Sequence, residues 1–416
     1  MKKQLVAALL ATVVALPLFA QQKSTQWGWP QPYEKVSGKS VAWLKDKGWW
    51  PVNVAYQAPW SGQNTVNIVM DRQGLLKARG VETKYQAFPS GPAINETIVS
   101  ARFQVGNGGN FPFTSLLDKN IPVKAIAILS PNLLHALVVP PDSKLKSIKD
   151  LKGSNPSATI GLVTGSSAEF YFQKAMEVNG IVAGKDVILK NMPPGEQMAL
   201  PKGIDGVVSW DPTPAMMVTE RKNGRIIDSI FPYNMYEGQF YVRQEMIDNV
   251  PDVVQAFSDA FAEATLWIRL YPDRAAQLKS EDPMLRNFSK EILLQQVKAY
   301  SNLYKPTNIY PHAHFWGQVN ESIFKWLYDQ KRLTRPLTSK DFEAAVDERF
   351  MKKTFEKLGW AVPKQPPFIP AGWTGDPAKQ PYPDYVHAIN TREAQPFPEK
   401  GDLVKAWSFG GKAYNP

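Results

Sequence analysis

Predicted strands and helices alternate through the middle of this chain in two successive series. The first series predicts strands at 52–56, 81–88, 102–106 and 121–129, with helices at 65–78 and 93–100. The second predicts strands at 135–139, 159–163, 187–191, 206–210, 225–228 and 238–242, with a helix at 167–179. Such alternation is typical of α/β domains. We therefore expect two α/β lobes with largely parallel sheets, the second inserted into the first.

A helix-rich region follows these two series. The strongest helical pattern covers 251–270, with Pro251 at its start, apolar residues along one side and Pro272 just after its end. Further helices are predicted at 289–300, 317–330 and 339–358. Beyond Trp360 the chain is rich in proline, and we expect an extended tail packed on the surface.

These patterns divide the chain into five parts. We expect a signal peptide at 1–20, an N-terminal arm at 21–50, lobe 1 at 51–132 and 231–300, lobe 2 at 133–230, and C-terminal helices with a proline-rich tail at 301–416. The length suits two lobes plus an extension. The arm is polar and aromatic with Gly and Pro, so we expect it to lie on the fold before regular structure begins.

The first 20 residues have the parts of a secretory signal peptide. Lys2 and Lys3 form a basic head, an uncharged apolar run of about 15 residues ends at Phe19, and Ala20 precedes a polar stretch. A retained anchor is the alternative, but a membrane span needs about 20 apolar residues. We expect cleavage after Ala20 and a periplasmic location. Without any Cys, the chain can form neither a disulfide nor a lipidated cysteine.

The formal charge of +10 is a weak indication of function. It could favour an anionic solute or an anionic membrane surface, or simply reflect a solvated surface. The Lys residues are spread along the chain and form no run of the kind that binds nucleic acid. We therefore expect no nucleic-acid partner.

Ligands of open parallel sheets bind beyond the carboxyl ends of the strands. The loops at these positions are 56–60, 89–92, 108–112, 164–167 and 210–214. Ser166 and Glu169 have the spacing of a capping box after Gly165, and Ser90 and Gly91 precede a second predicted helix. The serines could only cap these helices, or they could also bind an anionic or polar head group. Two helix N-termini facing one cleft would form an anion clamp.

Large aromatic and acidic residues accompany the same loops. Trp60 and Trp210 could form apolar walls over a ligand, or could belong to the core. Asp211 and Glu237 are the nearest acidic residues, and they could form local ion pairs or receive an ammonium or hydroxyl group of a ligand.

The sequence offers little that could support catalysis. His312 and His314 could suggest a metal, but they follow Tyr-Pro without carboxylates at ligand spacing, which predicts a solvated turn. His135 and His387 stand alone, and the phosphate-loop, nucleophile-elbow and zinc-protease motifs are absent from the sequence. We expect a protein that is not an enzyme, without catalytic residues, cofactor or metal.

Several stretches resemble the periplasmic binding proteins of the nitrate, sulfonate and taurine ABC transporters. The similarity is carried by Val54-Ala55-Tyr56-Gln57, by Phe88-Pro89-Ser90-Gly91-Pro92-Ala93 and by 123–132 in the first series. In the second series it is carried by 148–153, by Gly161-Leu162-Val163-Thr164-Gly165-Ser166-Ser167-Ala168 and by 204–212, and then by 249–257. Together these stretches cover roughly Val52 to Gln277.

The resemblance implies a two-lobed periplasmic binding protein (type II) fold, here with a C-terminal helical and proline-rich extension. It implies a hinged, monomeric protein that captures a small organic anion, of sulfonate, taurine or aromatic carboxylate type, and delivers it to an ABC permease in the inner membrane. The candidate ligand-binding residues are Gln57, Trp60, Ser90, Gly91, Asn110, Phe111, Thr164, Gly165, Ser166, Ser167, Trp210, Asp211, Tyr236 and Glu237.

The sequence departs from the family in its aromatic arm, its Gly-Gly-Asn-Phe-Pro loop and its long C-terminal extension. A bulkier or aromatic solute is therefore plausible, with Trp60, Phe111 and Trp210 lining the cleft. Two alternatives remain. One is a periplasmic sensor or scaffold that binds a partner through its tail. The other is an enzyme of the related pyrimidine-synthesising type, which a signal peptide and the absence of cysteine oppose.

Overall fold

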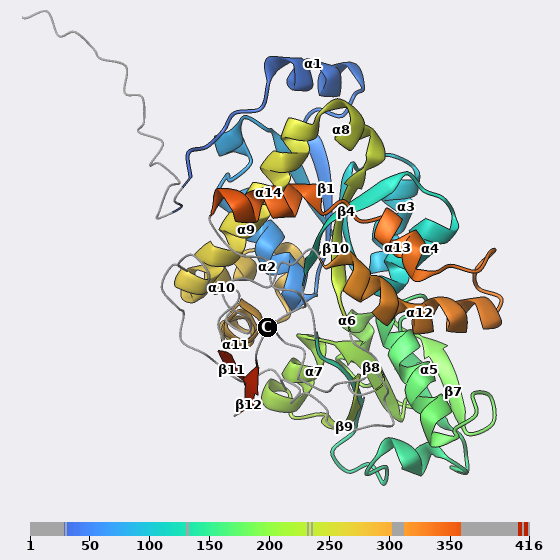
Figure 1. The fold of residues 1–416 in the computed structure, drawn as a ribbon. Helices are drawn as coiled ribbons and strands as arrows, with labels where there is room; N and C mark the ends of the chain where they lie inside the picture. Colours follow the sequence, from blue (N-terminus) through green and yellow to red (C-terminus); the bar gives the residue numbers. More distant parts are fainter. Residues whose placement is uncertain are drawn as a thin grey trace, which may run out of the picture.

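The computed structural model describes residues 29, 31–129, 133–230, 233, 236–301, 312–358, 407–409 and 412–414. Two α/β lobes stand one above the other in Figure 1. The predicted signal peptide and most of the proline-rich tail lie outside the described residues. No helix in the described ranges is both long enough and apolar enough to cross a membrane.

Lobe 1 is built on a five-stranded mixed sheet. Its strands are β1 (Val52–Gln57), β2 (Thr83–Phe88), β3 (Val105–Gly109), β4 (Val123–Leu129) and β10 (Gly238–Arg243), in the order β2-β1-β3-β10-β4. β1 is parallel to β2 and β3, whereas β10 is antiparallel to both β3 and β4. The helices of this lobe are α2 (Ser61–Arg72), α3 (Gly91–Val99), α4 (Asn110–Asp118), α8 (Gln244–Asn249), α9 (Pro251–Leu270), α10 (Pro272–Ser280) and α11 (Lys290–Ser301).

Lobe 2 is built on a second five-stranded sheet. Its strands are β5 (His135–Val139), β6 (Ala158–Leu162), β7 (Val187–Asn191), β8 (Gly206–Trp210) and β9 (Arg225–Ser229), in the order β7-β6-β8-β5-β9. Its helices are α5 (Ser167–Asn179), α6 (Pro194–Gln197) and α7 (Thr213–Ala215), which runs into a π-helical turn at Met216–Glu220. β10, which the sequence analysis placed in the second series, rejoins the first sheet, so the strands β5 to β9 are inserted between β4 and β10.

The expectation of largely parallel sheets is wrong at the crossings between lobes. β5 enters lobe 2 and pairs antiparallel with β8 and β9, and β10 returns to lobe 1 antiparallel to its neighbours. Both strands begin where the lobes meet, at His135 and Gly238, whereas their neighbours β8 and β3 end there, at Trp210 and Gly109. Their apolar runs resemble those of parallel strands because all of their residues are buried.

Three predicted helices have clearly different bounds, and one of them, predicted at 317–330, begins earlier, at Ala313. The helix predicted at 65–78 begins at Ser61 and ends at Arg72, since Gly74 takes a left-handed conformation and only a short 3-10 turn, Lys77–Arg79, follows. The helix predicted at 339–358 is split into α13 (Ser339–Ala344) and α14 (Arg349–Lys357). The residues between them hydrogen-bond to edge strand β4, where Asp347 N donates to Ala125 O (2.7 Å).

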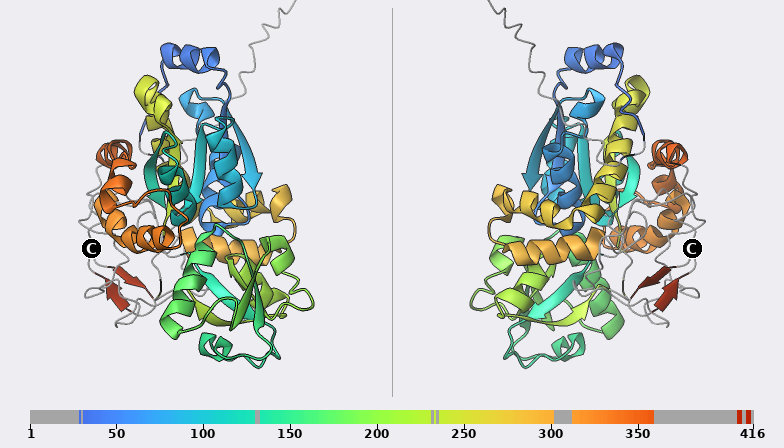
Figure 2. Two further views of the ribbon diagram at one scale, coloured as in Figure 1. Left: turned by 90° about the vertical axis from the view of Figure 1, so that its right-hand side faces the viewer. Right: turned by 90° about the vertical axis from the view of Figure 1, so that its left-hand side faces the viewer.

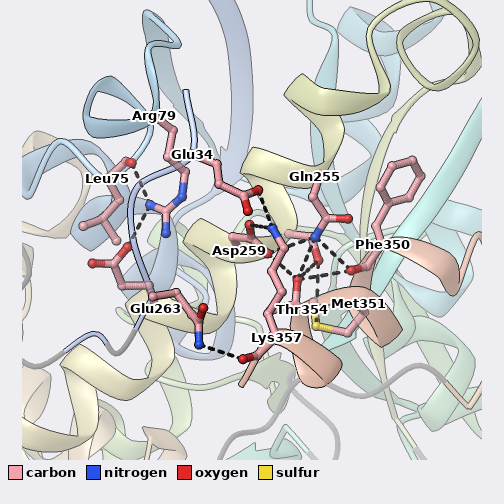
Figure 3. A network of polar contacts seen from close by, with 12 residues as sticks. Glu34, Leu75, Arg79, Gln255, Asp259, Glu263, Phe350, Met351, Thr354 and Lys357 are labelled. Carbon is pink, nitrogen blue, oxygen red and sulfur yellow. Dashed lines mark hydrogen bonds and ion pairs between the residues drawn. The ribbon is translucent and has the colours of Figure 1, made fainter. Parts of the chain in front are cut away.

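The N-terminal arm contains a helix that was not predicted, α1 (Gly38–Asp46), so regular structure begins before residue 52. Ser37 caps this helix by accepting from Ser40 N. Upstream of α1, the arm lies beside α9 and α14 in a network of polar contacts (Figure 3). There Arg79 and Glu263 form a fully buried ion pair (2.8 Å), and Lys357 contacts both Glu34 and Asp259.

Candidate functional site

The loops at the carboxyl ends of β1, β3, β6 and β8 meet where the two lobes face each other. They enclose a cavity of about 20 Å³. A cavity needs roughly 10–15 Å³ to hold one water molecule, so this one holds little more than that. It is lined by Gln57, Trp60, Gly91, Gly109, Pro112, Leu133, His135, Ser166, Ser167, Trp210 and Tyr236.

Glycine allows the backbones to approach closely at this cavity. A Cβ atom at Gly109 would lie 2.7 Å from both Ser167 Oγ and Tyr236 Oη. A Cβ atom at Gly91 would lie 2.6 Å from the Pro112 ring. Only residues without a side chain fit at these two positions, and the first turns of α3 and α5 can therefore both reach the cavity.

Hydrogen bonds between the lobes hold this cleft closed. Trp210 Nε1 in lobe 2 donates to Pro59 O in lobe 1 (2.7 Å). Ser167 Oγ at the start of α5 donates to Asn110 Oδ1 at the start of α4 (3.0 Å). Both bonds join one lobe to the other, so both must break if the lobes separate.

The serines of α5 have protein partners in this closed arrangement. Ser166 Oγ donates to Val163 O (2.6 Å) and accepts weakly from Glu169 N. The predicted capping box is incomplete, because the Glu169 carboxylate accepts from Gly165 N rather than from Ser166 N. Ser166 therefore caps its helix, whereas the hydrogen bond that the Ser167 hydroxyl forms within the described part of the chain crosses between the lobes and would be released by opening.

Aromatic rings form one wall of the cavity. Trp60 packs edge-on against Tyr236, with ring centroids 5.6 Å apart, and Tyr236 packs against His135 at 4.8 Å. Burial lowers the pKa of His135 to about 4, so its ring is neutral near pH 7. Its Nδ1 lies 3.0 Å from Leu133 O. Since a carbonyl oxygen only accepts, Nδ1 carries the proton and Nε2 is left as an acceptor.

A buried carboxylic acid lies behind the cavity. Glu237 accepts hydrogen bonds from the side-chain amides of Asn320 (2.6 Å), Gln239 (2.9 Å) and Asn110 (3.3 Å). Burial raises the pKa of Glu237 to about 8, although these three amides lower it. Through Asn110, Glu237 supports the residue that bonds Ser167 across the cleft.

A helix of the C-terminal extension, α12 (Ala313–Asp329), lies near the level where the two lobes meet (Figures 1 and 2). It supplies Asn320 to Glu237 in lobe 1. Its Trp326 ring packs against Phe170 of lobe 2 (5.4 Å) and Phe111 of lobe 1 (6.3 Å). Just after the helix, Arg332 forms an ion pair with Glu169 of lobe 2 (2.9 Å). The extension thus contacts both lobes.

The predicted site residues fall into two groups. Those that line the cavity are Gln57, Trp60, Gly91, Ser166, Ser167, Trp210 and Tyr236. Those outside the lining are Ser90, Asn110, Phe111, Thr164, Gly165, Asp211 and Glu237. Phe111 packs into the aromatic cluster under α12, and Thr164 is exposed. Asn110, Asp211 and Glu237 are buried next to the lining.

Sequence reasoning missed His135 and Leu133, which also line the cavity, whereas Gly109 and Pro112 of the lining belong to the predicted loop 108–112. His135 opens β5 and pairs with Trp210 on β8, and only the antiparallel register brings the two together. The expectation of a solvated turn is wrong for His312, which is buried, whereas His314 is exposed and contacts Glu343 (2.9 Å). No cluster of three or more His, Asp or Glu side chains suited to a metal occurs among the residues described.

This chain is similar in sequence to known proteins. The NMT1/THI5-like family model matches residues 63–275. A Bacillus subtilis protein whose name assigns it to aliphatic sulfonate binding is 23% identical over 288 residues, which cover 68% of this chain and 82% of that protein.

Solved structures share the fold at low sequence identity. The alkanesulfonate-binding protein SsuA of Xanthomonas axonopodis, bound to MOPS, superposes with a TM-score of 0.60 at 16% identity and covers 71% of this chain and 97% of its own. The periplasmic nitrate-binding protein NrtA of Synechocystis gives a TM-score of 0.62 at 15% identity over 74% and 88%. This likeness confirms the predicted two-lobed periplasmic binding protein fold.

Proposed function

Since this chain belongs to the NMT1/THI5-like family, we propose that it is the periplasmic solute-binding component of an ABC importer. It captures a small organic anion between its lobes and presents it to a permease in the inner membrane, acting as a monomer without a catalytic step. The similar proteins named for sulfonate and nitrate binding support this class of ligand.

The observation that carries the proposal is the convergence of two helix N-termini on one interlobe cavity. Gly91 begins α3 in lobe 1, and Ser166 and Ser167 begin α5 in lobe 2, and all three line the same cavity. The first N–H groups of a helix point outward and carry partial positive charge. Two such ends from different lobes can grip an anion only when the lobes close.

The small size of the cavity supports a hinged mechanism. Pockets that bury small-molecule ligands are typically about 300–1,000 Å³, whereas this cavity is about 20 Å³. A solute can therefore enter only after the lobes separate and the Trp210 and Ser167 bonds between them break. Binding then stabilises the closed form by mass action.

A thermal-shift screen of the purified protein tests the proposed function. Sulfonates, taurine, nitrate, carboxylates and pyrimidines would each be added at increasing concentration. We expect at least one of the anions to raise the melting temperature in a saturable manner. Stabilisation by none of them would reject solute capture and favour a sensor or scaffold that binds a partner protein.

A further inference from the structure

A cluster of buried polar side chains lies where α2, α10 and α11 of lobe 1 meet the residues around Asp211 of lobe 2. Its members, called here the Lys279 cluster, are Gln63 and Asn64 on α2, Lys279 on α10, Gln296 on α11 and Thr213 on α7. Each of them is 0% exposed. The cluster therefore gathers polar groups from both lobes in the protein interior.

Several side-chain atoms of this cluster have no hydrogen-bond partner among the described residues. These atoms are Lys279 Nζ, Asn64 Nδ2, Thr213 Oγ1 and both amide atoms of Gln63 and of Gln296. Native proteins contain few buried polar groups without partners, because each one forfeits its hydrogen bonds to water. A concentration of them in one place indicates a group, brought in from solution, that these atoms bind.

Two hydrogen bonds bring the members of the cluster together. Tyr56, near the end of β1, donates to Asp282, just past the end of α10. Trp210 donates to Pro59 O, which brings Asp211 and Thr213 beside the start of α2. Helices α10 and α11 pack against each other and against α2, as Figure 1 also shows. All of these elements therefore converge on residues 56–64.

Lys279 gives the cluster its charge. Burial lowers the pKa of Lys279 to about 7, while the nearby charges of Asp211 and Asp282 raise it. Neither carboxylate forms an ion pair with Lys279 Nζ. A bound anion would favour the charged ammonium form. The cleft cavity itself is lined by no Lys or Arg among the residues described, so Lys279 is well placed to supply a full positive charge.

Building on the proposed function, we propose that the Lys279 cluster contributes to the same solute site: Lys279 pairs with the anionic group together with the helix N-termini, and the amides of the cluster bind hydroxyl or amino substituents of the solute. The solute is then a small hydrophilic organic anion. Amide side chains both donate and accept, so Gln63, Asn64 and Gln296 suit such substituents. An aromatic solute fits less well, because Phe111 is already packed against Phe170 and Trp326. Lys279 and Gln296 also lie beyond residue 275, where the family match ends.

Calorimetric titration of the full-length protein with three sulfonates of similar size tests this inference. The probes are ethanesulfonate, 2-hydroxyethanesulfonate and taurine. A site that hydrogen-bonds a substituent rejects the analogue that lacks it. We expect the hydroxyl or amino compound to bind at least 10-fold more tightly than ethanesulfonate. Equal binding of all three, or tighter binding of ethanesulfonate, would overturn the inference.

Two variants test whether sulfonate binding and the preference for substituted sulfonates depend on the Lys279 cluster. Lys279→Met keeps the length of the side chain without its charge, and we expect it to weaken binding of every sulfonate at least 10-fold. Gln296→Leu should mainly reduce the preference for 2-hydroxyethanesulfonate or taurine over ethanesulfonate. If Lys279→Met does not fold, Gln296→Leu still tests the inference. The control is the double variant Ser166→Ala, Ser167→Ala, which alters the start of α5 and leaves the cluster intact.

The results of these experiments distinguish a failure of this inference from a failure of the proposed function. Loss of binding in both cluster variants supports the inference. Wild-type binding in both, with loss only in the serine double variant, would place the anion at the helix N-termini and overturn the inference while the proposed function stands. If no solute in the thermal-shift screen stabilises the wild-type protein, the proposed function fails first.

Discussion

Two regions outside residues 63–275, the range that the family model matches, contact the two lobes in different ways. The N-terminal arm and α14 meet on α9, through Tyr33 and Glu263 (2.6 Å) and through Lys357 and Asp259 (3.0 Å), so these contacts lie within lobe 1 (Figure 3). Helix α12 and the residues after it contact both lobes, through Asn320 in one direction and Arg332 in the other.

The two sets of contacts should therefore affect different properties of the protein, namely its free energy of unfolding and the opening of its lobes. Contacts between the arm, α9 and α14 keep the same partners whether the lobes are together or apart. The contact of Arg332 with Glu169 joins the extension to lobe 2, so a hinge motion between the lobes must break it or carry the extension along. Changes in the arm network should therefore alter stability alone, whereas changes around α12 should also alter closure.

The largest effect is expected from Glu263→Ala. This substitution leaves Arg79, whose side chain is 3% exposed, buried without its carboxylate. Removing one partner of a buried ion pair costs about 3–5 kcal/mol of unfolding free energy. Urea denaturation measures this loss. The matched control is Lys352→Ala, which removes a solvent-exposed pair with Glu348 on α14 and should cost no more than about 1 kcal/mol.

Glu263→Ala should leave the affinity for the solute unchanged. Calorimetry on the same variant should give the wild-type dissociation constant, because Tyr33 and Arg79, which donate to the Glu263 carboxylate, lie in the arm network and do not line the cavity. A large change in affinity would mean that the arm network senses lobe closure.

The sequence predicts much of the fold because its local signals agree with the tertiary structure. Pro251 and Pro272 bound α9 as expected, and the strands from β1 to β10 lie at or near their predicted positions. The first turn of α5 was recognised from Ser166 and Glu169. Such signals depend on neighbouring residues alone, so one sequence is enough to read them.

The rest of the site depends on contacts between distant segments. His135 reaches the cavity through antiparallel pairing with β8, and Asn320 reaches Glu237 from a helix 83 residues further along the chain. In the sequence, Lys279 is a lysine in the last turn of a helix, which is a common position for an exposed lysine. Its burial follows from the packing of α10 between α2 and α11, which no local pattern of residues reveals.

A second prediction concerns Glu237, which anchors α12 to lobe 1. Its pKa is raised from 4.5 to about 8 by burial, so the folded protein holds this proton more tightly than the unfolded chain. The unfolding free energy should therefore fall as pH rises from about 5 to about 8, by an amount of the order of a few kcal/mol or less. Glu237→Gln, which cannot titrate, should show a smaller fall.

Urea denaturation at pH 5, 6.5 and 8 measures this difference. Asp228 of lobe 2 contributes in the same direction, since burial raises its pKa to about 7, so the comparison is between wild type and variant at each pH. Asp228→Asn is the control that removes a similar pH dependence at a lobe 2 carboxyl with no hydrogen bond to α12 among the described residues. Parallel pH profiles for wild type and Glu237→Gln would mean that Glu237 does not hold its proton in the folded protein.

The smallest effect is expected from Arg332→Ala. The Arg332 side chain is 31% exposed, so its ion pair with Glu169 should contribute only about 0.2–1 kcal/mol. Because this pair joins the extension to lobe 2, its loss should favour the open form, which a larger radius of gyration in X-ray scattering and a several-fold weaker solute affinity would report. Arg335→Ala is the matched control, since Arg335 is similarly exposed but bonds Asp341 within the extension itself. If both variants scatter and bind alike, the contact of α12 with lobe 2 does not restrain the cleft.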